Sequence, residues 1–390
     1  MLIFCGKKDM KNSRGRVAII SRESNEKTID VELLERELRR RGVETLTLSR
    51  LLTKDRSARS LAYAGHVLKQ EAAILRASVV VLDTYCIPAS MLPHRKKTKV
   101  IQMWHALGAI KKFGWQTVGR PDGTSERVAS LMKMHDGYDY VLSPSDVTAE
   151  HFCEAFRADM ESIVKLGLPR IDHIKSVSAG SEREKTAKRI FERYPQLKDR
   201  KIVLYAPTFR RGKPVRVKDL TDAIDTDRYA VAVKLHPLYR EGSRAVGKGV
   251  IADEEFSSYE WLSVADIIIS DYSSFVIECT LADKPLYIYA YDMDEYDKTT
   301  GLNIDFRTEP IAPYVFSTAA GLADSMEKKY DMKALERFRD RYIDIDTGSA
   351  EDGGCTSRLA DFIEEQLEEK PERSVRDALE SFFKRVNPGP

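Results

Sequence analysis

The sequence predicts an α/β protein made of two consecutive doubly wound parallel-sheet domains with a cleft between them. Short apolar runs rich in valine and isoleucine alternate with segments of helical spacing over residues 16–145. Continuous runs of this kind are typical of parallel strands that are covered on both faces. The phrase LGLPRIDHI (166–174) interrupts this alternation, and a second series of strands and helices starts at residue 201.

The first series contains five expected strands. They are RVAII (16–20), TLTLS (45–49), SVVVLDT (78–84), KVIQMWH (99–105) and YDYVLSPS (138–145). The segment TIDVELLERELRRRG (28–42) has apolar residues at helical spacing and a glycine stop, which predicts a helix between the first two strands.

The second series also contains five expected strands. They are KIVLYAPT (201–208), YAVAVKLHP (229–237), GVIAD (249–253), ADIIISD (265–271) and PLYIYAYD (285–292). A charged helix, SEREKTAKRIFERY (181–194), precedes them. The tail is largely helical and includes SRLADFIEEQLEE (357–369) and the amphipathic VRDALESFFKRV (375–386).

We therefore predict domains at residues 1–175 and 176–320, with helices over 321–390 that pack back on the body. The 390 residues can bury two cores, and a net charge of +2 gives no overall field that would attract nucleic acid. Five scattered cysteines without metal spacing predict thiols in a reducing cytoplasm. There is no apolar run of about 18 residues that could span a bilayer, and we expect no signal peptide.

One local stretch is strongly basic. Between Thr84 and Pro121 the sequence has no Asp or Glu. Its basic residues are Arg95, Lys96, Lys97, Lys99, Lys111, Lys112 and Arg120. Such a stretch favours an anionic ligand or an anionic membrane surface, and the alternative is a solvated basic face.

Two histidines stand at the ends of predicted strands, where open parallel sheets bind ligands. His105 follows Trp104, and His236 precedes Pro237. A single histidine at such a place is more often structural, but two that face one cleft could act as base and as transition-state stabiliser. The turn after the first histidine carries the residues expected to contact phosphate: Gly108, Lys111 and Lys112.

Two further strand ends are candidate anion sites. In SDYSSFVIE (270–278), Ser273 and Ser274 could cap a helix or offer hydroxyl and N–H groups to an anion. Glu278 could accept from sugar hydroxyls or be a buried structural carboxylate, and Asp271 is expected to orient the loop or a neighbouring side chain.

The loop YAPTFRRGKP (205–214) contains Thr208, Arg210 and Arg211. Its guanidinium groups could bind phosphate in a bidentate manner, and the alternative is a solvated basic hairpin. No cluster of carboxylates and histidines has metal spacing, so we predict no metal site and no cofactor, although a divalent cation stays possible.

Several phrases together resemble a known family. QMWHALGAIKKFG, GLPRID, YAPTFR, KLHP, SDYSSFVIE and PLYIYAYDMDEY occur in the order found in CDP-glycerol glycerophosphotransferases of wall teichoic acid synthesis, over about residues 76–306. The resemblance implies a GT-B-like architecture, with the acceptor bound by the N-terminal domain and the nucleotide by the C-terminal one. It also implies attack of an acceptor hydroxyl on the β-phosphate of a CDP-alditol, with release of CMP.

The resemblance also implies roles for individual residues. His105 and His236 match the catalytic histidines of the two domains. The residues at positions that contact the cytidine diphosphate are Thr208, Arg210, Ser273, Ser274 and Glu278. The family commonly has Gly and then Pro-Leu after Trp-His, whereas this chain has Ala106, Gly108 and Ala109, a variant closer to primases that add the first unit to a lipid-linked disaccharide.

The implied partners are a CDP-alditol, an undecaprenyl-diphosphate-linked saccharide and an anionic membrane surface. We expect a peripheral position on the inner face of the plasma membrane, through Arg95 to Lys99 or the stretch near Phe382 and Phe383. Three alternatives stay open: a CDP-ribitol donor, a GT-B glycosyltransferase or epimerase that uses a nucleotide sugar, and a non-catalytic protein that binds a lipid-linked saccharide.

Overall fold

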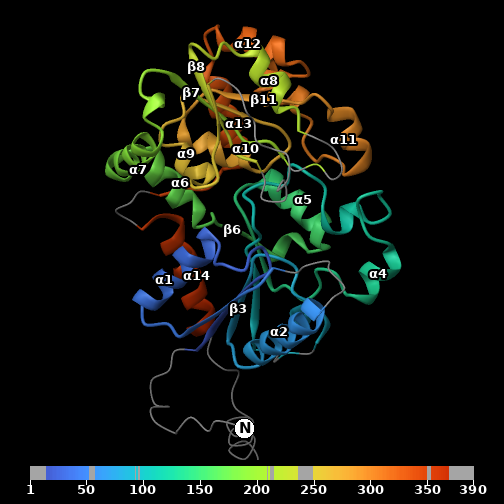
Figure 1. The fold of residues 1–390 in the computed structure, drawn as a ribbon. Helices are drawn as coiled ribbons and strands as arrows, with labels where there is room; N and C mark the ends of the chain where they lie inside the picture. The colour runs from blue at the N-terminus through green and yellow to red at the C-terminus, as the bar shows by residue number, and fades with distance from the viewer. Residues whose placement is uncertain are drawn as a thin grey trace, which may run out of the picture.

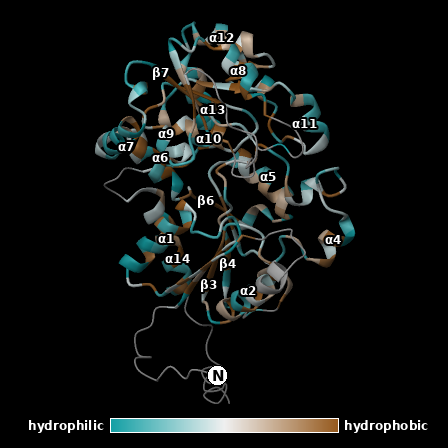
Figure 2. Ribbon diagram, viewed as in Figure 1, coloured by the Kyte–Doolittle hydropathy of each residue, from teal (hydrophilic) through white to brown (hydrophobic). Residues whose placement is uncertain are grey.

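The computed structural model describes residues 15–51, 58–92, 94, 97–208, 210, 215–235, 249–348 and 353–368. Within these residues the chain forms two six-stranded parallel sheets with helices on their faces, one in each half of the molecule (Figure 1). This arrangement confirms the predicted α/β class. Figure 2 shows apolar strands inside each half and hydrophilic helix surfaces outside.

The first sheet has the strand order β2-β1-β3-β4-β5-β6. Its strands are β1 (Val17–Ser21), β2 (Thr45–Ser49), β3 (Val79–Leu82), β4 (Lys99–Gln102), β5 (Tyr140–Ser143) and β6 (Ile163–Lys165). The last of them was not predicted, because three residues at a sheet edge are too short for a pattern to show. The helices of this half are α1 (Ile29–Arg40), α2 (Ala58–Ile74), α3 (Ile87–Met91), α4 (Glu126–Leu131) and α5 (Asp146–Phe156).

The second sheet has the order β12-β11-β10-β7-β8-β9. Its strands are β7 (Lys201–Tyr205), β8 (Tyr229–Val233), β9 (Val250–Ala252), β10 (Ile267–Ser270), β11 (Leu286–Tyr289) and the unpredicted β12 (Val315–Phe316). Its helices are α8 (Val217–Ala223), α9 (Ser258–Trp261), α10 (Phe275–Glu278), α11 (Met293–Thr299), α12 (Ala319–Met326) and α13 (Met332–Tyr342).

Two helices lie in the sequence between the two sheets, α6 (Arg170–Ser178) and α7 (Gly180–Arg193), and the last described helix is α14 (Gly354–Glu368). The last returns to the first half and packs against α1 and α6 (Figure 1). Short 3₁₀ helices are η1 (Gly114–Thr117), η2 (Met160–Ser162), η3 (Pro195–Leu197), η4 (Cys279–Ala282), η5 (Phe306–Thr308) and η6 (Ala312–Tyr314). The amphipathic stretch predicted at 375–386 lies outside the described residues.

Local sequence explains why the first helix starts where it does. The Thr28 side chain caps α1 by accepting from the N–H of Val31, and acidic residues in the first turn complement the positive end of the helix dipole. Leu34 and Leu38 are fully buried against the sheet. The helical spacing seen in the sequence is thus the buried face of α1.

A short backbone ladder joins the two halves. The N–H of Lys112 donates to the carbonyl of Gly301 (3.0 Å), and the N–H of Asn303 donates to the carbonyl of Ile110 (2.8 Å). Lys111 and Leu302 form an antiparallel bridge between these bonds. The turn that follows Trp104-His105 is therefore tied to the second half.

An aromatic cluster supports this turn from the other side. Trp104 has a left-handed backbone (φ 63°) and stacks on Phe113 with 4.6 Å between ring centroids. Phe156 and His135 lie edge-on to the indole at 5.2 and 5.8 Å. An unusual backbone conformation persists only where its surroundings hold it, and these rings hold the segment that carries His105.

Among the described residues, no helix has the length and hydrophobicity needed to cross a bilayer. Of the segments predicted to contact a membrane surface, Arg95, Lys96, Phe382 and Phe383 lie outside those residues.

The buried His135 predicts a specific acid sensitivity. Burial lowers the pKa of its imidazole to about 3, whereas in an unfolded chain it is about 6.5. As pH falls from about 6.5 towards 3, the unfolded state takes up a proton that the folded state does not, so this group removes up to about 1.4 kcal/mol of stability per pH unit. Above about pH 6.5 the imidazole is neutral in both states, so this loss of stability is absent.

His135 has a left-handed backbone (φ 62°), a conformation that Asn tolerates. We therefore expect His135→Asn to flatten the dependence of the unfolding free energy on pH. Urea unfolding at pH 7.5, 6 and 5 measures this. Equal acid sensitivity in variant and wild type would contradict the assignment.

Candidate functional site

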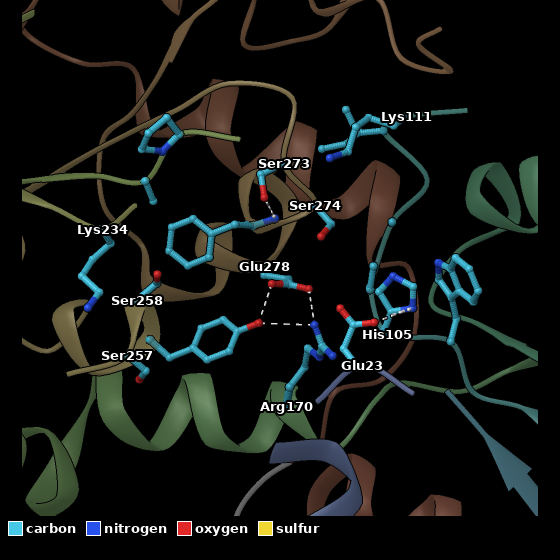
Figure 3. Close-up of a pocket in the computed structure, with 18 of the residues that line it drawn as sticks. Glu23, His105, Lys111, Arg170, Lys234, Ser257, Ser258, Ser273, Ser274 and Glu278 are labelled. Carbon is cyan, nitrogen blue, oxygen red and sulfur yellow. Dashed lines mark hydrogen bonds and ion pairs between the residues drawn. The ribbon is translucent and has the colours of Figure 1, made fainter. Parts of the chain in front are cut away.

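A cavity of about 480 Å³ lies between the two halves and receives residues from both (Figure 3). The residues that the sequence predicted and that the structure brings together here are Trp104, His105, Gly108, Lys111, Ser273, Ser274 and Glu278. The first four follow β4 of the first sheet, and the last three follow β10 of the second. The cavity therefore sits where the carboxyl ends of both sheets face each other, as expected for ligand sites in such folds.

His105 is fixed through one nitrogen of its ring. Its Nδ1 lies 3.0 Å from the backbone carbonyl of Asp83, which favours a proton on Nδ1 and leaves Nε2 as the acceptor. The carboxylate of Glu23 lies 3.9 Å from the same Nδ1. The Asp83 carboxyl is itself buried, and this burial raises its pKa to about 6.

Gly108 packs closely against the side chain of Ile277. A Cβ atom at this position would stand 2.1 Å from Cδ1 of Ile277, which is on α10. The glycine lets the turn from the first half approach the helix that follows Ser273-Ser274. Besides its predicted contact with substrate, Gly108 thus allows the two halves to approach each other closely at this point.

Lys111 lines this cavity and also a second one of about 410 Å³, whose lining includes Lys112. Burial lowers the pKa of the Lys111 ammonium, against the opposing effect of Asp271. The lysine pair of the sequence is thus divided: Lys111 lines both cavities, and Lys112 lines the second.

The serine pair stands at the start of α10, a helix of only one turn. The hydroxyl of Ser273 accepts from the N–H of Phe275 (3.3 Å). Ser274 occupies the N-cap position without a capping hydrogen bond from its side chain, and it lines the cavity. The Ser274 hydroxyl is therefore available to a ligand, as Figure 3 shows.

Glu278 is a buried carboxylate at the floor of the cavity, with 2 % exposed. It accepts from Nη1 of Arg170 (2.8 Å) and from the hydroxyl of Tyr259 (2.6 Å). Arg170 is also bound to Asp30 of the first half, with 2.8 Å from Nε to Oδ2. The sequence left two roles open for Glu278, a ligand for sugar hydroxyls or a buried structural carboxylate. Because both of its oxygens already accept hydrogen bonds from the protein, the geometry favours the structural role.

Arg210 lies away from the main cavity and lines the second one. Its guanidinium pairs with Asp271 (2.8 Å) and with Asp292 (2.7 Å) and is only 4 % exposed. This differs from the expectation of a guanidinium that is presented to phosphate, because two carboxylates already satisfy it. Asp271 also accepts from the N–H of Thr208 (2.8 Å), so it orients this loop.

Three predicted site residues, Arg211, His236 and Pro237, lie outside the described residues. Lys234, two positions before His236, lines the main cavity and donates to the Asp253 carboxylate (3.1 Å). The chain that follows β8 therefore reaches this cavity at Lys234.

Sequence reasoning missed several lining residues, among them Glu23, Arg170, Lys234 and Tyr259. Arg170 and Lys234 lie inside the quoted phrases GLPRID and KLHP and could have been singled out there. Glu23 follows β1 with no motif around it. In the part of the chain that the structure describes, no group of three or more His, Cys, Asp or Glu residues could hold a metal ion.

Comparison with known proteins identifies relatives over most of the chain. Residues 7–365 match the family described as CDP-glycerol:poly(glycerophosphate) glycerophosphotransferase. The chain is 32 % identical over 320 residues to a teichoic acid ribitol-phosphate primase of Bacillus spizizenii, covering 77 % of this chain and 78 % of that one. It is 28 % identical over 307 residues to a teichoic acid glycerol-phosphate primase of Bacillus subtilis, covering 77 % and 76 %.

Solved structures share the fold. The wall teichoic acid polymerase TagF matches with a TM-score of 0.70 at 19 % identity, covering 92 % of this chain and 90 % of that one. A UDP-GlcNAc 2-epimerase from Neisseria meningitidis matches with a TM-score of 0.57 at 11 % identity, covering 89 % and 99 %. The GT-B-like architecture and the family resemblance are thus confirmed. This chain belongs to the CDP-glycerol:poly(glycerophosphate) glycerophosphotransferase family.

Proposed function

We propose that this protein transfers glycerol phosphate from CDP-glycerol to a hydroxyl of a lipid-linked saccharide or teichoic acid primer and releases CMP. The observation that carries the proposal is the shared cavity, in which His105 of the first half faces Ser273 and Ser274 of the second. Family membership supports the reaction class, and relatives that are named teichoic acid primases support the pathway.

The reaction requires one bond to form and one to break. The acceptor oxygen attacks the β-phosphorus of the CDP-alditol, the bond from that phosphorus to the bridging oxygen breaks, and CMP leaves. Little covalent chemistry is asked of the protein, so positioning and charge stabilisation carry most of the catalysis.

His105 is suited to take the acceptor's proton. Because its Nδ1–H is directed to the Asp83 carbonyl, Nε2 is the ring atom left to accept a proton. The nearby Glu23 carboxylate would stabilise the imidazolium that forms. The predicted role of His236 on the leaving-group side stays a prediction.

Charge on the diphosphate would be stabilised from the second half. The Ser274 hydroxyl faces the cavity, and Lys111 also lines it (Figure 3). Hydrogen bonds to an ionised phosphate oxygen are among the stronger kind.

Ribitol phosphate is the second candidate for the transferred group. It is favoured by the 32 % identity to a ribitol-phosphate primase, against 28 % for the glycerol-phosphate primase of Bacillus subtilis.

The proposal also places the protein peripherally on the inner face of the plasma membrane, where it would reach a lipid-linked acceptor. A protein that does not co-sediment with anionic liposomes would argue against this location.

Product analysis tests the reaction class. Purified protein, an acceptor saccharide with a short lipid and either CDP-glycerol or CDP-ribitol should yield CMP, and the faster donor identifies the alditol. A UDP-sugar supplied in parallel should yield no nucleoside diphosphate. Release of UDP from that arm, without CMP from the others, would favour the glycosyltransferase alternative.

Replacing the candidate base tests the mechanism. We expect His105→Ala to lower kcat by about 10²–10⁴-fold, the usual contribution of a general base, while its affinity for CDP-alditol stays within a few-fold. His151→Ala is the matched control, because this half-buried histidine on α5 is outside the cavity. Turnover near the wild-type rate in His105→Ala would return the histidine to a structural role.

A further inference from the structure

Two arginines at the carboxyl edge of the first sheet have no carboxylate partner among the described residues. Arg22 follows β1 and Arg50 follows β2, and the N–H of Arg50 donates to the carbonyl of Ser21 (3.1 Å). Both are half-buried. The Nε of Arg22 is buried without any hydrogen-bond partner.

The surroundings hold these side chains without neutralising them. The Arg22 guanidinium lies 5.3 Å from the centre of the Tyr85 ring. Burial raises the pKa of the Tyr63 hydroxyl, while the charges of both arginines and a hydrogen bond with Arg22 act to lower it. The adjacent carboxylate, Glu23, is directed to His105. Because a half-buried charge without a counter-ion is costly, this edge favours an anionic ligand.

Arg22 and Arg50 lie along the same carboxyl edge of the sheet as the candidate base His105, on strands further from it. In the order β2-β1-β3-β4, His105 follows β4, and its ring contacts Asp83 after β3. The N–H of Arg22 donates to the hydroxyl of Thr84 (3.1 Å), next along the same edge. With neighbouring strands about 4.8 Å apart, the strands of Arg22 and Arg50 are about 10 and 14 Å from that of His105. An extended substrate at His105 would reach them.

We propose that the carboxyl edge of the first sheet binds the acceptor along its length, and that Arg22 and Arg50 form an anion subsite for a phosphate group which the acceptor carries apart from its reacting hydroxyl. The inference rests on the proposed function, because it requires the acceptor hydroxyl at His105. Guanidinium groups suit this role, since their fork matches two phosphate oxygens.

Two sources can supply such a phosphate. One is the diphosphate that links a saccharide to its lipid, and the other is an alditol phosphate unit already attached to the saccharide. Three acceptors distinguish them: a saccharide diphosphate with a short lipid, the same saccharide as a neutral glycoside that carries one alditol phosphate, and the neutral glycoside alone.

The test compares Arg22→Gln, Arg50→Gln and the double variant with Arg16→Gln. Arg16 immediately precedes the same strand β1 at the opposite edge of the sheet, so it changes net charge equally without touching the subsite. We expect kcat/KM for the phosphate-bearing acceptor to fall about 10–100-fold in the double variant, as for loss of a charged hydrogen bond. The KM for the donor should stay at the wild-type value in these variants. The Arg16→Gln enzyme should keep the wild-type kcat/KM for the acceptor.

The outcomes separate the alternatives. Loss with only one of the two phosphate-bearing acceptors identifies the source of the phosphate. An unchanged kcat/KM for both, or an equal loss with the neutral glycoside, would overturn the subsite. If Arg22→Gln melts at a lower temperature than wild type, Arg50→Gln and Arg22→Lys carry the test, the latter keeping the charge but losing the fork.

A binding measurement separates this inference from the proposed reaction. Calorimetric titration of each acceptor without donor needs no turnover. Binding that depends on the two arginines, in an enzyme that releases no CMP from any CDP-alditol, would keep the subsite and refute the reaction. Binding that does not depend on them, together with normal CMP release, would do the reverse.

Discussion

One buried guanidinium joins the two halves by ion pairs, beside the backbone ladder between residues 110–112 and 301–303. Arg170 is 7 % exposed and binds Asp30 of the first half and Glu278 of the second, which are 1 % and 2 % exposed. Removing one partner of a buried ion pair leaves a charge that neither water nor protein satisfies, at a cost of about 3–5 kcal/mol. The two sheets therefore cannot separate or rotate at this point without exposing the triad, and the facing ends of β4 and β10 keep their distance.

This constraint also decides which groups a substrate can use. Glu278 and Arg210 look from the sequence like ligands for a nucleotide, but their charges are already matched by Arg170, Asp271 and Asp292. The groups that face the cavity include the His105 imidazole, the Ser274 hydroxyl and the Lys111 ammonium. A base on one sheet and anion-binding groups on the other are the division of labour that transfer between a donor and an acceptor needs.

Much of the fold could be predicted because parallel strands that are buried on both faces leave an apolar signature in the sequence. β2 falls on the predicted residues, whereas the short edge strands β6 and β12 had no pattern to read. The convergence of His105 with Ser273 and Ser274 could be predicted from strand ends. The partners of Arg210 and Glu278 could not, because Asp292 and Arg170 lie far from them in sequence and only the folded chain brings them near.

The most direct measurement of the central claim is a double-mutant cycle on unfolding free energy with Asp30→Asn and Glu278→Gln. These carboxylates bind the same guanidinium from opposite halves, so the account predicts a coupling energy of about 1–3 kcal/mol between them. Changes that add within about 0.5 kcal/mol, as expected for independent sites, would contradict the view that Arg170 holds the two halves together.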